Sequence, residues 1–133
     1  MKKVHLTVGV LLVIAFLLTG QYMDKFHNHL VNMPDGPRML YRTRHIFILL
    51  TGLLNLVIAA YYTPRSKQWR RNFQLVGSAL IFASGLLFIT AFFYEPGLKD
   101  LHTPLSHLGV EAIIAGTVLH LLSGAGQKNE GRN

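Results

Sequence analysis

Four long apolar stretches alternate with short polar segments along the chain. They cover residues 4–22, 46–62, 73–93 and 105–122. The hydrocarbon core of a bilayer is about 30 Å thick, and about 20 helical residues span it. The pattern therefore predicts an all-α integral membrane protein, an up-down-up-down four-helix bundle that takes up residues 1–133 as a single domain.

The polar segment after the first stretch has its own pattern. Over residues 23–33 an apolar residue recurs every three or four positions, a spacing that places such residues on one face of a helix. The residues at this spacing are Tyr22, Phe26, Leu30 and Met33. We expect the first helix to continue as an amphipathic extension over residues 23–33, until the sequence Pro-Asp-Gly-Pro at residues 34–37 stops it.

The composition is typical of a protein whose surroundings are a lipid bilayer. Half of the 133 residues are hydrophobic and 14% are charged, whereas about a quarter of the residues in soluble domains are charged. Four membrane spans use most of the chain, so the sequence leaves no room for a soluble domain.

The positive charges indicate membrane topology. The net charge is +7, but the Lys and Arg residues lie beside the apolar stretches and form no separate basic domain, so we do not expect nucleic-acid binding. With the N-terminus inside, eight of them fall on the cytoplasmic side and five on the other, in the direction of the positive-inside rule. We therefore expect a multi-pass protein of the bacterial inner membrane with both termini in the cytoplasm.

Several kinds of chemistry are excluded by what the sequence lacks. It has no cysteine, so no thiolate can ligate a metal or an iron–sulfur cluster. It also has no HExxH motif, no G-x-S-x-G motif and no glycine-rich phosphate loop. Any ligand to a metal or cofactor must come from histidine, methionine or a carboxylate.

Under this topology the histidines fall into two layers. His5 and His120 belong to the inner end of the bundle. The others belong to the outer end: His27, His29, His45, His102 and His107. Ionisable groups at membrane depth are costly, and they usually face a protein interior and have a function. His27 and His29 lie in a polar segment, where both a ligand role and a solvated role are open.

The outer layer supports a haem hypothesis. In an up-down-up-down bundle the second and fourth helices are diagonal partners, so His45 and His107 can ligate the iron of a b-type haem from opposite sides. Arg42 and Arg38 precede His45 by three and seven residues on the same helical face. They are the candidate partners of the haem propionates.

The inner layer and the fourth span offer further sites. A second haem between His5 and His120 is a weaker hypothesis, because His120 is rotated by about 220° from His107 on an ideal helix. Glu111 follows His107 by four residues, so both lie on one helical face. That pair suits a metal site or a proton relay.

A fourth hypothesis needs no permanent cofactor. A polar pocket of His45, Asn55, His107 and Glu111 inside an apolar bundle suits a quinone, whose carbonyl groups accept hydrogen bonds and whose tail lies in the lipid. Interhelical hydrogen bonds by the same histidines, without any ligand, are the simplest structural interpretation.

Small residues mark helix-packing faces. They recur at seven-residue steps: Gly52 and Ala59, Ser78 and Gly85, and Gly109, Gly116 and Ser123. Such faces allow membrane helices to approach closely. The faces of Ser78, Gly85, Gly109 and Gly116 are also the candidate contacts of a homo-oligomer or a hetero-oligomer, as in a small accessory subunit of a larger complex.

The placement of His5, His45, His107 and His120 resembles that of small bacterial b-type cytochromes and, more loosely, membrane proteins of the copper-resistance D type. The opening Lys3-x-His5, followed by an apolar span that ends at residues 19–20, is similar to their first helix. The resemblance covers a few positions and implies haem or metal bound near the span ends. The chain departs from the two-haem pattern because its third span has no histidine and its second has one.

The residues thus leave three functions open. One is electron transfer with the quinone pool through one b haem at His45 and His107, with Glu111 as proton partner. Another is a non-catalytic accessory subunit. The third is a small metal or proton transporter built on His107 and Glu111.

Overall fold

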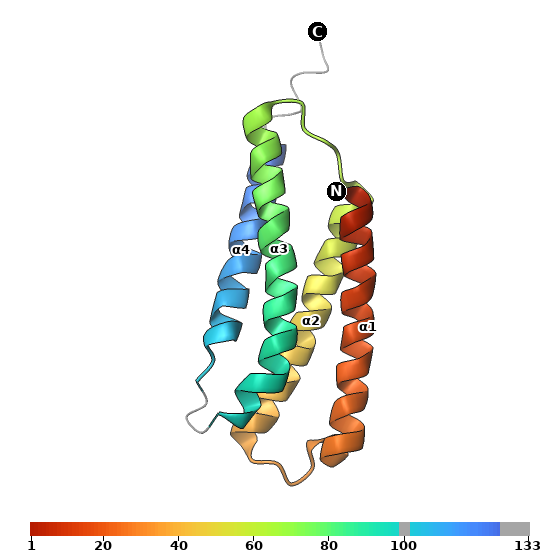
Figure 1. Ribbon diagram of the computed structural model, residues 1–133, viewed down its shortest axis with the longest axis vertical. Coiled ribbons are helices and arrows are strands. Elements are labelled where there is room, and N and C mark those ends of the chain that lie inside the picture. Colours follow the sequence, from red (N-terminus) through yellow and green to blue (C-terminus); the bar gives the residue numbers. More distant parts are fainter. Residues whose placement is uncertain (99–101, 126–133) are drawn as a thin grey trace.

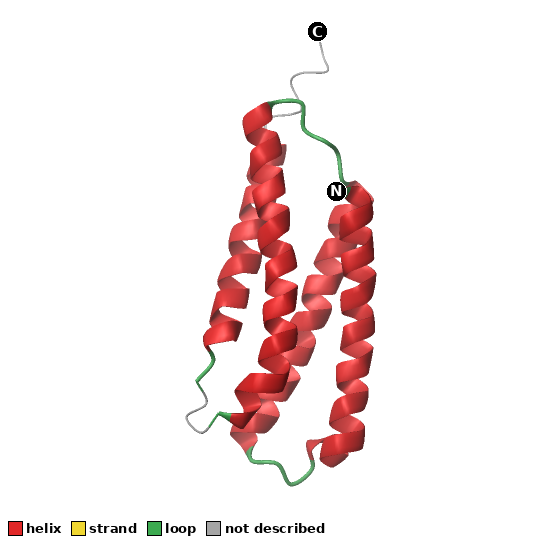
Figure 2. Cartoon of the chain, viewed as in Figure 1, coloured by secondary structure: helices red, strands yellow, loops and turns green. Residues whose placement is uncertain are grey.

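The computed structural model describes residues 1–98 and 102–125, and these form four long helices that run alternately down and up (Figure 1). The described part of the chain contains helices and loops and no strand (Figure 2). The helices are α1 (Lys2–His27), α2 (Asp35–Tyr61), α3 (Gln68–Tyr94) and α4 (Pro104–Gly124), and short 3-10 turns follow α1 (Asn28–Leu30) and α3 (Glu95–Gly97).

The bundle has an apolar outside and a partly polar inside. All four helices are long and apolar enough to cross a membrane. Large side chains such as Leu17 and Leu86 are more than half exposed, whereas Thr51, Asn55 and Ser78 are fully buried. An aqueous surface would favour the reverse distribution. The fold is therefore compatible with the expected multi-pass membrane protein.

The connection between α1 and α2 differs from the expected amphipathic extension. The helix α1 ends at His27, because Asn28 takes the left-handed conformation (φ 46°) that asparagine tolerates better than most residues. The 3-10 turn then buries Leu30. The Pro-rich segment starts α2, with Pro34 at its N-cap and Pro37 in its first turn, where proline is tolerated.

The small-residue faces pack inside the chain. A Cβ atom on Gly116 would lie 2.7 Å from the carbonyl oxygen of Gly77, so α3 and α4 touch backbone to backbone there. Gly109 lies against the ring of Phe88 in the same way, and Gly85 lies against Leu12 of α1. These faces, which the sequence offered for contacts with a partner, are occupied by the chain's own helices.

The four helices form two antiparallel pairs. The helix α1 packs along α2 and α3 packs along α4, and the pairs meet mainly through α2 and α3 (Figure 1). Among the described residues, α4 makes extensive contact only with α3, and it is the least buried of the four helices. One side of α4 is therefore uncovered.

Candidate functional site

A buried hydrogen-bonded network joins α1, α2, α3 and α4 near the N-terminal end of α1. The His5 ring is fully buried, with Nδ1 2.7 Å from Asn55 Oδ1 and Nε2 2.9 Å from Ser78 Oγ. The Nε2 atom of His120 lies 2.9 Å from the same hydroxyl oxygen. Two imidazoles from the first and last helices thus converge on one serine.

The partners determine which ring nitrogens carry hydrogen. The amide nitrogen of Asn55 donates to the Thr51 carbonyl oxygen at 2.9 Å, so its Oδ1 faces His5 and accepts from Nδ1–H. A neutral His5 therefore has a lone pair at Nε2, which competes with the Gln74 carbonyl oxygen for the one hydrogen of the Ser78 hydroxyl. The Ser78 oxygen then accepts Nε2–H from His120.

The Ser78 hydroxyl has one hydrogen but lies within hydrogen-bond distance of more than one acceptor. Its oxygen also lies 2.7 Å from the Gln74 carbonyl oxygen, but one hydroxyl hydrogen cannot be donated fully to both Gln74 and His5. If His5 gains a proton, its Nε2–H donates to Ser78, and the hydroxyl hydrogen turns to Gln74 or His120. The network therefore has two hydrogen-bonded states that differ by one proton.

An apolar pocket of about 220 Å³ lies beside this network, and His120 is part of its wall. The C-terminal half of α2 and the last turns of α4 supply most of the lining, which includes Leu54, Val57, Thr117 and Leu121. The volume is below the roughly 300–1,000 Å³ typical of sites for drug-sized ligands. This volume suits a single substituted ring.

Polar groups close the end of this pocket. The Tyr62 hydroxyl donates to Gln74 Oε1 at 3.1 Å, and the Gln74 amide donates to the Thr63 carbonyl oxygen at 3.1 Å. Burial raises the pKa of the Tyr62 phenol, against a smaller opposite effect of Arg71 and Arg65. Tyr62 is thus a neutral hydrogen-bond donor that holds Gln74 in place beside Ser78.

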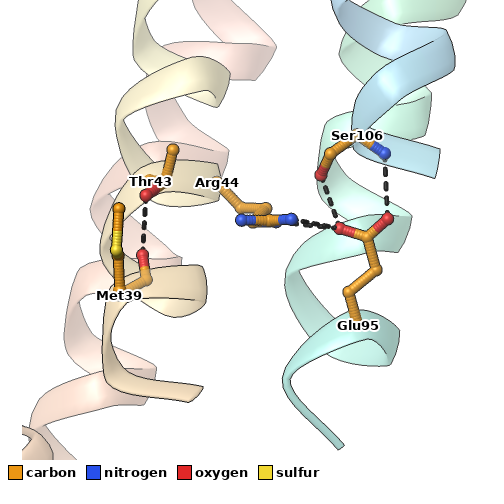
Figure 3. A network of polar contacts seen from close by, with 5 residues as sticks. All are labelled: Met39, Thr43, Arg44, Glu95 and Ser106. Carbon is orange, nitrogen blue, oxygen red and sulfur yellow. Dashed lines mark hydrogen bonds and ion pairs between the residues drawn. The ribbon is translucent and has the colours of Figure 1, made fainter. Parts of the chain in front are cut away.

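A second polar cluster lies at the opposite end of the bundle. The guanidinium of Arg44 on α2 contacts Glu95 Oε2 through Nε at 2.8 Å and Nη2 at 2.7 Å (Figure 3). The Ser106 backbone N–H donates to Glu95 Oε1 at 2.9 Å, and the Ser106 hydroxyl donates to Oε2. The Glu95 carboxylate is fully buried, so these donors tie α2 and α4 to the turn that follows α3.

The two residues of the expected haem pair have different surroundings. The Thr19 hydroxyl donates to the backbone carbonyls of α1, so His45 Nδ1–H donates to the Thr19 oxygen at 2.9 Å, and the His45 ring stacks on Phe16 at 4.0 Å. His45 therefore faces α1. His107 is exposed on α4, and no contact joins the two rings within the described residues. The haem hypothesis for this pair stays a prediction from the sequence.

The other candidate residues lie outside the bundle. Glu111 is exposed beside His107 on α4. Arg38 pairs with Asp35, and both line a surface groove together with Arg42.

The remaining outer histidines do not gather either. His29 pairs with Asp24 at 2.6 Å in an exposed position, His27 packs against Tyr41, and His102 is exposed. Within residues 1–98 and 102–125, no group of three or more histidine, aspartate or glutamate side chains is arranged to hold a metal ion.

Sequence reasoning missed Ser78 as the centre of the network and Arg44–Glu95 as a buried pair. The signal for the first was present, because Ser78 lies on a small-residue face and His120 shares its face with Gly116. The second had no such signal, since Glu95 directly precedes a proline in a segment that the sequence assigned to a loop.

Comparisons of the chain with models of known protein families, with curated proteins and with solved structures found no match. The resemblance to small b-type cytochromes therefore stays a prediction from the sequence.

Proposed function

We propose that this chain is a four-span protein of the bacterial inner membrane that binds a quinol in the pocket beside His120 and accepts its proton through Ser78 onto His5. The observation that carries the proposal is the convergence of two imidazole Nε2 atoms on Ser78 Oγ, each at 2.9 Å. The neighbouring pocket is apolar and lies between α2 and α4, where a lipid-soluble ligand can enter.

The directions of the hydrogen bonds determine the path by which the quinol proton reaches His5. In the neutral network His120 donates from Nε2, so its Nδ1 has a lone pair, which accepts a hydrogen bond from a quinol hydroxyl. When the quinol loses one electron to an external one-electron acceptor, one O–H bond breaks, its proton binds His120 Nδ1, and a neutral semiquinone is left. The Nε2 proton then passes to Ser78, and the Ser78 hydroxyl proton passes to His5.

The final state is stabilised by Asn55. After the transfer, the His5 ring carries hydrogen on both nitrogens, and its positive charge is shared with the Asn55 oxygen, which already accepts from Nδ1 at 2.7 Å. The two steps inside the network each move a proton along an existing hydrogen bond whose nitrogen and oxygen atoms lie 2.9 Å apart. Such steps are fast when donor and acceptor are within hydrogen-bond reach.

The tautomers of the two histidines test the relay. Nitrogen NMR of protein labelled with ¹⁵N-histidine is expected to show hydrogen on Nδ1 of His5 and on Nε2 of His120 near neutral pH. In Ser78→Ala the Nε2–H of His120 loses its acceptor, and the His120 signals are expected to become a mixture of tautomers. If His5 carries its hydrogen on Nε2, the relay as drawn is wrong.

Ligand binding tests the pocket. A decyl-tailed quinol is titrated into purified protein in lipid nanodiscs. His120→Phe keeps a flat ring but removes the acceptor, and binding is expected to weaken roughly tenfold. His107→Phe is the matched control, since it changes a histidine on the exposed side of the same helix, and it is expected to bind normally. Equal affinities of the two variants would contradict the proposal.

The topology is part of the proposal. The network end of the bundle holds the N-terminus of α1 and the start of α3. Arg65, Lys67, Arg70 and Arg71 lie around that start, which supports a cytoplasmic location for this end. The proton would thus be held near the cytoplasmic end of the bundle.

Haem-based electron transfer stays a separate hypothesis from the sequence. One observation favours a ligand role for His45: its Nδ1–H is held by Thr19, which leaves Nε2 as the free ligand nitrogen. A reduced-minus-oxidised visible spectrum tests it directly. An α-band that disappears in both His45→Ala and His107→Ala would replace the quinol proposal by a haem protein.

A further inference from the structure

The uncovered face of α4 carries two ionisable residues in an otherwise apolar surface. His107 and Glu111 are both exposed, and Glu111 lies about 10 Å along α4 from its N-terminal end. Neither side chain has a hydrogen-bond or ion-pair partner within the described residues. In a membrane-spanning helix, this face would place an unpaired carboxylate against lipid tails, which is costly.

The exposed residues of this face form a regular seam. Their spacing is four, three, four and three, as in the contact positions of a two-stranded coiled coil. They are His107, Glu111, Ile114, Val118 and Leu121. The last three are between 47% and 69% exposed. A second helix with the same repeat would cover the whole seam.

We propose that a second copy of this chain occupies the seam and forms a parallel two-fold dimer through α4. The seam is self-complementary, because it offers one imidazole and one carboxylate a single helical turn apart. In a parallel pair the two imidazoles form one layer and the two carboxylates form the next. His107 of each copy then reaches Glu111 of the other, and the two-fold axis makes the two contacts identical.

The α4 surface favours a second copy over an unrelated helix. A two-fold dimer satisfies both polar side chains of both copies with no further residue. The other helices do not compete for this surface, since α4 makes its extensive contacts with α3 through its Gly109 and Gly116 side. Of the seam residues, Leu121 alone also lines the pocket at His120, which is otherwise formed mainly by α2 and by Thr117 and His120 of α4.

Cysteine cross-linking in membranes tests the dimer. The natural chain has no cysteine, so Ile114→Cys introduces a single thiol into the seam. The matched control is Leu86→Cys, an exposed leucine on α3. Mild oxidation of membranes is expected to give a dimer band with Ile114→Cys and none with Leu86→Cys. Equal cross-linking of the two variants, or an Ile114→Cys product whose mass shows that another protein is attached, would overturn the proposal.

The ion pair is tested by energy transfer between labelled copies in vesicles. Glu111→Leu removes the acceptor and is expected to weaken dimerisation roughly tenfold, since two interhelical hydrogen bonds are lost. Glu111→Gln keeps an oxygen acceptor and is expected to dimerise within about threefold of the natural chain. Far-ultraviolet circular dichroism verifies that both variants are folded. Dimerisation of Glu111→Leu at full strength, with its helices intact, would refute the role of the pair.

Discussion

Removal of the Arg44 guanidinium is expected to destabilise the bundle by about 3–5 kcal/mol, the usual result of leaving one member of a buried ion pair without its partner. In Arg44→Met, the buried Glu95 carboxylate loses both contacts to Arg44 and keeps only the two donors of Ser106. The methionine side chain retains most of the apolar volume of the arginine stem. The loss is therefore electrostatic rather than a packing defect.

A double-mutant cycle isolates this loss. Glu95→Gln keeps oxygen and nitrogen atoms for Ser106 but carries no charge, so Arg44→Met combined with Glu95→Gln is expected to be at least about 2 kcal/mol more stable than Arg44→Met alone. Equilibrium unfolding in mixed detergent micelles, followed by circular dichroism, gives the free energies. Arg42→Met is the control, because Arg42 is exposed two residues earlier on the same helix.

The result that would refute this reasoning is specific. If Arg44→Met costs no more than Arg42→Met, the Arg44–Glu95 pair is not a buried ion pair in the folded protein. If Arg44→Met is costly but the double variant is equally costly, the methionine packs badly and the charge of Glu95 is not the cause.

Three further predictions concern the same bundle, each measured by the same unfolding assay. Gly116→Ala is expected to cost about 1–3 kcal/mol, because the new methyl group meets the Gly77 backbone 2.7 Å away; exposed Ala115→Leu is its control. Ser78→Ala is expected to cost about 1–3 kcal/mol by leaving two imidazoles short of a partner, and buried Ser84→Ala, which loses one bond to its own helix, distinctly less. Asn28→Val is expected to cost about 1 kcal/mol because valine disfavours the left-handed backbone.

The hydropathy pattern was sufficient to predict the number and the approximate positions of the helices. It was less informative about where they end. The helix α2 begins at Asp35, well before the apolar stretch that starts at residue 46. The residues between these two points, among them Arg38, Arg42 and Arg44, are helical but mostly polar. A polar helical turn has no hydropathy signal, so only the two prolines marked this start.

The sequence did not determine which side of α4 packs against the rest of the chain. The expectation was that ionisable residues at membrane depth face the interior, which pointed to His107 and Glu111. In the structure both are exposed, whereas Gly109 and Gly116 are buried. Because α4 is apolar around most of its circumference, its glycines fix the buried side. His120 shares that side with Gly116 and His107 lies opposite, as the helical period requires.

The two buried polar clusters differ in a way that separates structure from function. At the Glu95 end, the carboxylate receives four donor contacts from Arg44 and Ser106, so every charge has a partner and no proton needs to move. At the His5 end, the single hydroxyl hydrogen of Ser78 faces competing acceptors, and a pocket lies beside the network. A fully satisfied cluster is rigid in one arrangement. A cluster with two arrangements one proton apart can take up a proton and pass it on, which is why we place the function at the His5 end and assign the Glu95 end to stability.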